Sequence, residues 1–184
     1  FLEKLLNRYP GLLIEGCCGG GGRFDAGMLY YTPQIWCSDN TDAIDRLKIQ
    51  YGTSFFYPVS TSGSHVSAVP NHQTGRITSL HTRGVVAMSG IFGYELDPGK
   101  LSDEEKEETR QQIKTYKKYA GLIQSGDYYR LSDPFKDIYT AWENISKDGT
   151  QVILSIVINE IHGNMPVYYV KLKGLKANTI YKDI

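Results

Sequence analysis

The chain has 184 residues, enough for one ordinary domain or for part of a domain followed by a small second one. Hydrophobic residues make up 41 % and charged residues 22 %, which excludes a disordered chain and is typical of a soluble globular protein. Lys plus Arg and Asp plus Glu are balanced at 20 each, and no apolar run approaches the ~20 residues that span a bilayer. We therefore expect neither nucleic acid nor a membrane as a partner.

The first 25 residues predict a helix, a strand and a glycine-rich loop. Apolar residues recur at helical spacing over residues 1–8, and Pro10-Gly11 ends the pattern. Residues 12–14 are apolar and predict a short buried strand, which leads into Glu15-Gly16-Cys17-Cys18 and four glycines at 19–22. The chain lacks an initiator Met and begins inside an amphipathic pattern, as expected for a piece of a longer protein.

Strands and helices then alternate. We expect strands at Gln34–Trp36, Ser54–Val59 and Ile91–Leu96, with a loop at 60–75. The helices are expected at about Asp42–Tyr51 (capped by Asn40 or Thr41 and ended by Gly52), at 77–88, and from a Ser102–Glu105 capping box to about Ile123.

The pattern changes after Gly126 to short alternating segments of antiparallel type. These are Tyr128–Leu131, Tyr139–Ile145, Val152–Asn159, Val167–Lys173 and Thr179–Lys182, with a hairpin turn at Lys147-Asp148-Gly149. The expected fold class is therefore α/β: the C-terminal half of a (β/α)₈ TIM barrel over residues 1–124, followed by a small antiparallel all-β domain over residues 127–184.

The three cysteines, Cys17, Cys18 and Cys37, form a poor disulfide framework. Their number is odd, two are adjacent, and neighbouring cysteines rarely pair with each other. The spacings typical of a zinc site are also absent. We interpret them as reduced thiols of a cytosolic (cytoplasmic) enzyme.

The glycine-rich loop, residues 15–25, would lie at the C-terminal end of a strand, where a barrel keeps its active site. Consecutive glycines allow backbone to approach a ligand closely. Neither a P-loop nor a dinucleotide-binding pattern occurs in the required context, because Arg23 and Phe24 follow the glycines. A flexible surface loop is the alternative interpretation.

A second loop, residues 36–42, offers two carboxylates next to an aromatic residue. Glycosidases use one carboxyl group to protonate the leaving oxygen and another as nucleophile or base. Asp42 falls in the first turn of the expected helix, where a carboxylate is explained by capping and the helix dipole. Asp39 precedes the cap and is free to point into a cleft.

Taken together, these loops resemble the α-galactosidases of glycoside hydrolase family 36. The family reads E-x-C-x-x-G-G-x-R-x-D and Q-x-W-x-S-D-x-T-D, which match the chain from Glu15 to Asp25 and from Gln34 to Asp42. The segments D-A-I-D-R-L-K-I-Q-Y-G, G-S-H-V-S-A-V-P-N-H-Q and F-G-Y-E-L-D are similar to the family too. Cys18 stands where Ser is frequent and Cys37 where Thr is frequent.

The resemblance implies roles for particular residues. Asp39 would be the catalytic general acid/base, and Cys17, Cys18, Gly19 and Gly20 would line the substrate-binding subsite for the galactose ring. The family's nucleophile lies in a K-W-D-x-N motif, which this sequence does not contain, so we expect it upstream of this chain. The chemistry requires no cofactor and no metal.

The resemblance also implies an α-galactoside oligosaccharide partner, with terminal α-1,6-linked galactose as in melibiose and raffinose, and a homo-oligomeric parent. A raffinose-synthase-like galactosyltransferase, and a non-catalytic carbohydrate-binding or structural fragment, remain alternatives. His65 and His72 are interpreted as structural residues that support neighbouring loops.

Overall fold

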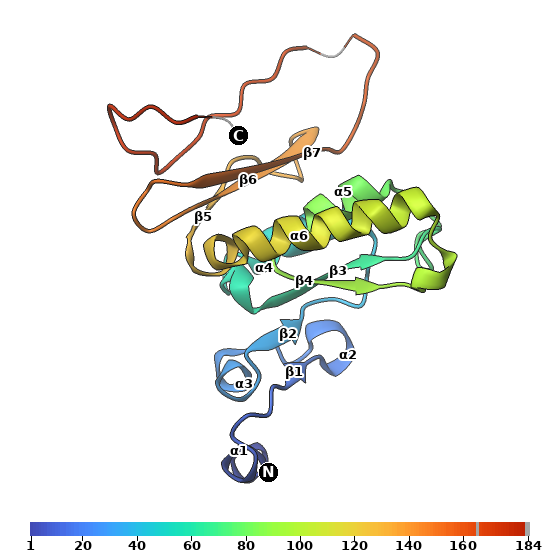
Figure 1. The fold of residues 1–184 in the computed structure, drawn as a ribbon, viewed down its shortest axis with the longest axis vertical. Coiled ribbons are helices and arrows are strands. Elements are labelled where there is room, and N and C mark those ends of the chain that lie inside the picture. The colour runs from blue at the N-terminus through green and yellow to red at the C-terminus, as the bar shows by residue number, and fades with distance from the viewer. Residues whose placement is uncertain (165, 183–184) are drawn as a thin grey trace.

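The computed structural model describes residues 1–164 and 166–182, and they form two sheets (Figure 1). One sheet is parallel and four-stranded in the order β1-β2-β3-β4; the other is antiparallel in the order β5-β6-β7. The strands are β1 Glu15–Gly16, β2 Gln34–Trp36, β3 Ser62–Ser67, β4 Ile91–Glu95, β5 Asp127–Arg130, β6 Tyr139–Ile145 and β7 Val152–Ile158.

Helices separate the successive parallel strands. Helix α1 precedes the sheet, the short α2 and α3 connect β1 to β2, and α4, α5 and α6 follow β2, β3 and β4. Their bounds are α1 Leu2–Arg8, α2 Cys18–Gly21, α3 Ala26–Tyr31, α4 Ala43–Thr53, α5 Leu80–Ala87 and α6 Asp103–Ser125. Parallel strands in chain order, with helices between them, are what half of a (β/α)₈ barrel provides, so the predicted fold class is confirmed.

The first strand differs from its prediction. Residues 12–14 are not a strand, and Leu13 is 84 % exposed. The strand is instead the two-residue β1, which lies at the edge of the sheet formed by the described residues. None of the described residues covers the side chain of Leu13. Helix α3 was not predicted, although its N-cap Asp25, which accepts a hydrogen bond from Met28 N at 2.8 Å, is a helix-start signal.

The third strand was also misplaced. No strand forms at Ser54–Val59, and β3 lies within the segment predicted to be a loop. The strand reads S-G-S-H-V-S and is largely buried despite its polar side chains. Ser64 Oγ donates to Gln50 Oε1 at 2.7 Å and Ser67 Oγ donates to the Thr41 carbonyl at 2.9 Å. Those partners satisfy the hydroxyls of Ser64 and Ser67, so burial of these two side chains is tolerated, whereas the buried hydroxyl of Ser62 has no partner among the described residues.

Helix boundaries agree with the predictions within a few residues. Asp42 rather than Asn40 or Thr41 caps α4, which continues through Gly52. Helix α5 begins at Leu80, three residues later than predicted, with Ser79 as its cap. The Ser102 capping box that opens α6 is confirmed.

The antiparallel sheet confirms three of the five predicted strands. The β6–β7 hairpin turns at Gly149, whose φ is +65°, as predicted. Residues 167–173 and 179–182, predicted to be strands, are not strands. Tyr168 instead packs on Tyr139 of β6, with ring centroids 5.6 Å apart. Alternation of polar and apolar residues indicates that a segment could have two different faces, but it does not show whether another strand is available to pair with it.

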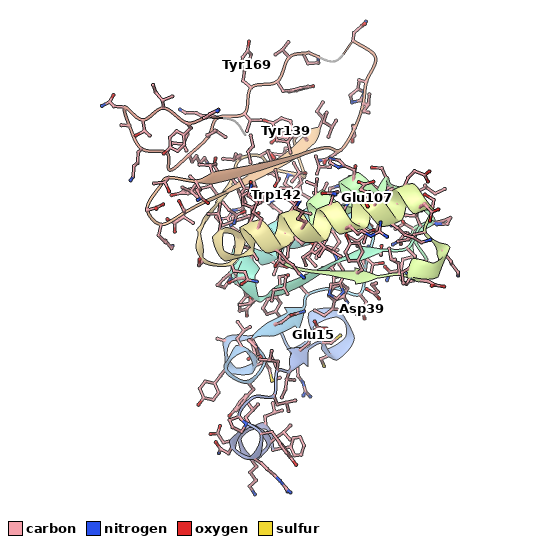
Figure 2. The ribbon with its side chains drawn as sticks, viewed as in Figure 1. Glu15, Asp39, Glu107, Tyr139, Trp142 and Tyr169 are labelled. Carbon is pink, nitrogen blue, oxygen red and sulfur yellow. The ribbon has the colours of Figure 1, made fainter. Side chains whose placement is uncertain are left out.

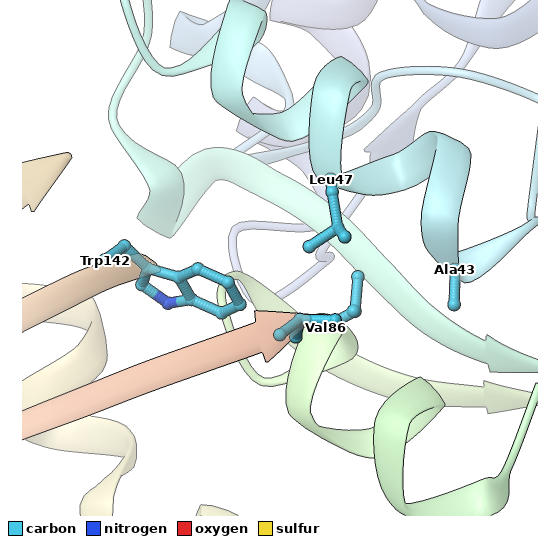
Figure 3. Packing of buried hydrophobic residues seen from close by; sticks show 5 residues of the cluster. Ala43, Leu47, Val86 and Trp142 are labelled. Atoms are coloured by element: carbon cyan, nitrogen blue, oxygen red, sulfur yellow. The ribbon is translucent and has the colours of Figure 1, made fainter. Parts of the chain in front are cut away.

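A shared core connects the two sheets (Figure 3). Its buried side chains come from α4, α5, β6 and β7, and the set is Ala43, Leu47, Val86, Trp142 and Val157. The indole of Trp142 is 4 % exposed and points toward Leu47 and Val86. The antiparallel sheet is therefore packed on the helices that follow β2 and β3, which keeps these helices and their loops in place.

Candidate functional site

Asp39 lies just beyond the C-terminal end of β2, in the loop that leads to α4 (Figure 2). Its side chain is exposed, although β2 itself is almost fully buried at Ile35 and Trp36. A buried strand is thus followed directly by a carboxylate at the surface. This is where parallel α/β proteins place catalytic groups.

The glycine-rich segment is a tight left-handed turn rather than an open loop. Residues 18–21 all have positive φ, from +61° at Cys18 to +90° at Gly21. The carbonyls of Cys17 and Cys18 accept hydrogen bonds from Gly21 N at 3.0 Å and Gly22 N at 3.1 Å. Glycine adopts this conformation without strain, whereas at Cys18 it costs about 1–2 kcal/mol. Strain of this kind is concentrated at functional sites.

The left-handed turn packs directly against the Asp39 loop. A Cβ atom on Gly20 would lie 2.7 Å from Asp39 N, and one on Gly21 would lie 2.8 Å from the Cys37 carbonyl oxygen. Cys17 Sγ is 3.9 Å from Asp39 Oδ1, within the reach of a weak sulfur hydrogen bond. The structure therefore brings together the predicted acid/base and the predicted sugar subsite, which are about 20 residues apart in the sequence.

Asp42 is occupied by structural contacts, as predicted. Its Oδ1 accepts hydrogen bonds from Ile44 N and Asp45 N, both at 3.0 Å, so it caps α4. Its Oδ2 accepts from Thr74 Oγ1 at 2.8 Å, and Arg76 forms an ion pair with Oδ1. A carboxylate that is 1 % exposed and bonded on both oxygens is unavailable for proton transfer.

Arg46 is a site residue that the sequence did not reveal. It lies in the first turns of α4, is 3 % exposed, and donates to the Ser38 and Asn40 carbonyls at 2.8 and 2.7 Å. Burial lowers the pKa of Arg46, and the neighbouring Cys37, together with the carboxylates of Glu95 and Asp39, partly opposes that effect. On the sequence alone, a charged residue on a charged helix is interpreted as solvent-exposed.

The β3–α5 loop supports the Asp39 loop from the other side. Gln73 Oε1 accepts a hydrogen bond from Thr41 N at 3.0 Å, and Asn71 Nδ2 donates to Thr41 Oγ1 at 3.0 Å. Both bonds fix the residue two positions after Asp39. The sequence analysis missed this support because the partners are 30 or more residues apart.

Of the two histidines considered above, His65 lies on β3 and not on a loop. Its ring packs on Trp36 with centroids 4.6 Å apart, and its Nδ1 is 3.8 Å from Glu95 Oε2. Burial lowers the pKa of His65, and the carboxylates of Glu15 and Glu95 partly oppose this. His72 is exposed in the β3–α5 loop.

Other kinds of site find little support. All three cysteines are free. Among residues 1–164 and 166–182, no group of three or more His, Cys, Asp or Glu side chains could hold a metal ion. The same residues form no helix with the length and apolar character needed to cross a bilayer.

The chain is similar in sequence to several known proteins. The sequence profile of the family described as Melibiase matches residues 1–126. The chain is similar to the bifunctional α-galactosidase/sucrose kinase AgaSK of Mediterraneibacter gnavus, with 65 % identity over 100 % of this chain and 20 % of that protein. It is similar to α-galactosidase AgaA of Geobacillus stearothermophilus, with 52 % identity over 98 % of this chain and 25 % of that protein.

The chain is also similar in fold to solved structures. The galactosidase domain of AgaSK superposes with a TM-score of 0.94 at 66 % identity, covering 95 % of this chain and 24 % of that one. A family 36 α-galactosidase AgaA variant from Geobacillus stearothermophilus, solved in complex with raffinose, superposes with a TM-score of 0.94 at 52 % identity, covering 96 % of this chain and 25 % of that one. The chain thus spans a fifth to a quarter of the length of these relatives.

Proposed function

Since this chain belongs to the melibiase family, glycoside hydrolase family 36, we propose that the whole protein is a retaining α-galactosidase with Asp39 as its general acid/base. The observation that carries the proposal is the exposed Asp39 carboxylate at the end of β2, packed against a left-handed glycine turn. The other carboxylate of the loop, Asp42, is committed to capping α4 and pairing with Arg76.

The proposed reaction is a double displacement. A carboxylate from the part of the protein outside this chain attacks the anomeric carbon, and the bond to the glycosidic oxygen breaks as Asp39 gives that oxygen a proton. Water then attacks the glycosyl-enzyme, Asp39 takes the proton from it, and the enzyme carboxylate leaves. The two carboxyl groups would be about 5–5.5 Å apart.

The left-handed turn would hold the sugar. Cys17, Cys18, Gly19 and Gly20 lie beside Asp39, and glycines expose backbone close to a ligand. As a substrate class we propose α-galactosides such as raffinose, because a similar α-galactosidase was solved with raffinose and another variant of it with stachyose. The α-1,6 linkage preference is part of the proposal.

The proposal extends to the location, the partners and the domain division of the parent. Three free cysteines favour a cytoplasmic location, and the parent is proposed to be a homo-oligomer with neither nucleic acid nor membrane as a partner. The change from parallel to antiparallel pairing between β4 and β5 supports a division into a barrel part, 1–124, and a β-domain, 127–184.

A raffinose-synthase-like galactosyltransferase is the second candidate. It would share the covalent intermediate and differ in the acceptor that attacks it. A carbohydrate-binding protein without catalysis is the third, and the position of Asp39 counts against it.

Substituting Asp39→Asn in the whole protein tests the proposal. General acid/base help is worth about 10²–10⁴ in rate, so raffinose turnover should fall by that factor. An activated aryl α-galactoside needs little protonation, so formation of its glycosyl-enzyme should be affected much less. The measurement is kcat/KM for the two substrates.

Asp42→Asn is the matched control, because it alters a carboxylate three residues away in the same loop. It should preserve the ratio of the two kcat/KM values while lowering stability by about 1 kcal/mol. Selective loss of raffinose turnover in Asp42→Asn, with near-normal turnover in Asp39→Asn, would reverse the assignment.

A further inference from the structure

Asp39 has little to orient its own side chain. Within the described residues, its carboxylate has one hydrogen-bonding contact, the 3.9 Å approach of Cys17 Sγ, and the side chain is exposed. A general acid must nevertheless lie within hydrogen-bond reach of the leaving oxygen. The direction of the carboxylate therefore depends on how firmly the backbone of residues 38–40 is held.

One guanidinium holds that backbone on both sides of Asp39. Arg46 Nη2 donates to the carbonyl oxygen of Ser38 at 2.8 Å, and Arg46 Nε donates to that of Asn40 at 2.7 Å. The residues before and after the acid are thus joined through a single planar group. Because the donors of Arg form a rigid fork, the two carbonyls are fixed relative to each other.

The guanidinium is itself held in place. Its carbon lies 4.1 Å from the centre of the Trp36 ring on β2, and its Nη1 contacts Cys37 Sγ at 3.0 Å and the Gly63 carbonyl at 3.4 Å. The side chain is 3 % exposed. Burying a cation is unfavourable unless its donors are satisfied, and here the donors are shared between the Asp39 loop and Gly63 of β3.

We propose that Arg46 is the positioning residue of the general acid: it sets the orientation of Asp39 by bridging the carbonyls of Ser38 and Asn40. This inference rests on the proposed function of Asp39. It assigns Arg46 no contact with the sugar and no part in proton transfer. Lysine cannot replace it, because one ammonium on a flexible stem cannot occupy both carbonyl positions as a fixed fork does.

The next helix supplies a matched control. Arg83 is the fourth residue of α5, as Arg46 is of α4; it is 4 % exposed and donates to the Thr78 carbonyl at 3.0 Å and the Ser67 carbonyl at 2.5 Å. It braces the β3–α5 loop, which carries no candidate acid. Arg46→Lys and Arg83→Lys make the same chemical change in equivalent places.

The test measures kcat/KM of the whole protein for raffinose and for an activated aryl α-galactoside. A misplacement of 1 Å costs about 10²-fold in rate, so Arg46→Lys should lower raffinose turnover about tenfold to hundredfold. Turnover of the aryl galactoside should fall less than about threefold, because it needs little acid help. Arg83→Lys should change the ratio much less than Arg46→Lys, because Arg83 reaches the Asp39 loop only through the residues of β3 and the β3–α5 loop that contact Thr41.

The ratio separates positioning from stability. Both substrates are converted by the same folded molecules, so a smaller folded fraction lowers both rates equally and leaves their ratio unchanged. An unchanged ratio in Arg46→Lys, or an equal change in Arg83→Lys, would overturn the inference. If Asp39→Asn itself shows no selective loss, the proposed function fails; if it does and Arg46→Lys does not, only the inference fails.

Discussion

The loop after β2 and the loop after β3 are held by the same kinds of contact but present different side chains. Each leads from a buried parallel strand to a side chain that caps a helix, Asp42 in one and Ser79 in the other. In each, a buried arginine at the fourth helical position donates back to loop or strand carbonyls. Yet of these two loops only the β2–α4 loop has an exposed carboxylate, Asp39. In the β3–α5 loop, the side-chain amides of Asn71 and Gln73 form hydrogen bonds with Thr41 of the β2–α4 loop.

The difference shows how a barrel scaffold separates chemistry from support. Caps and buried arginines hold both loops, so the loop that carries Asp39 is fixed by the same kinds of contact as its neighbour. What distinguishes the β2–α4 loop is its other neighbour, the left-handed turn at residues 18–21, which approaches Asp39 more closely than any side chain would allow. Substitutions in the turn and in the two caps therefore test whether the two loops differ in this way.

The largest expected effect on stability lies in the left-handed turn, where Gly20 and Gly19 form a matched pair. Both have positive φ, but a Cβ on Gly20 would meet Asp39 N at 2.7 Å whereas one on Gly19 would have nothing within 4 Å. Gly20→Ala should lower the free energy of unfolding by about 2–5 kcal/mol through strain and overpacking. Gly19→Ala should lower it by about 1–2 kcal/mol through strain alone.

Urea unfolding of the whole protein measures both values. Equal losses in the two variants would mean that backbone strain accounts for the effect and that the turn does not press on the Asp39 loop.

A smaller difference is expected between the two caps. Asp42 accepts two backbone N–H groups and also contacts Thr74 and Arg76, whereas the Ser79 hydroxyl accepts from Thr82 N at 3.2 Å. Asp42→Ala should therefore lower the free energy of unfolding by about 2 kcal/mol and Ser79→Ala by about 1 kcal/mol. A larger loss in Ser79→Ala would contradict the greater structural commitment of Asp42.

Sequence patterns predicted the parts of the fold that depend on neighbours in the chain. The apolar run of β2, the capping box of α6 and the alternation of β6 and β7 were all recognised, and Asp42 was correctly assigned to the start of α4. Strand β3 was missed because two of its buried serines, Ser64 and Ser67, are satisfied by Gln50 and Thr41, which are distant in sequence. Strand propensity depends on the residues of the segment itself, so it gives no information about such distant partners.

The residues of the candidate site also differ in how far the sequence could predict them. Asp39 and residues 17–20 could be predicted as candidates because their motifs are local, and the structure brings them together. Arg46 was not found, because only the folded chain shows that its guanidinium turns inward onto Trp36 and two carbonyls. The exposure of Leu13 was unpredictable for a related reason, since an apolar run does not reveal what covers it.

We propose that Asp39 is the general acid/base and not the nucleophile. The anomeric configuration of the product tests this assignment when the Asp39→Asn variant of the whole protein converts an activated aryl α-galactoside in the presence of azide. Azide needs no deprotonation, so it should attack the glycosyl-enzyme from the face that the acid/base normally serves. We expect faster turnover and an α-galactosyl azide, identified by NMR. A β-galactosyl azide would show that the glycosyl-enzyme no longer forms and that Asp39 is the nucleophile.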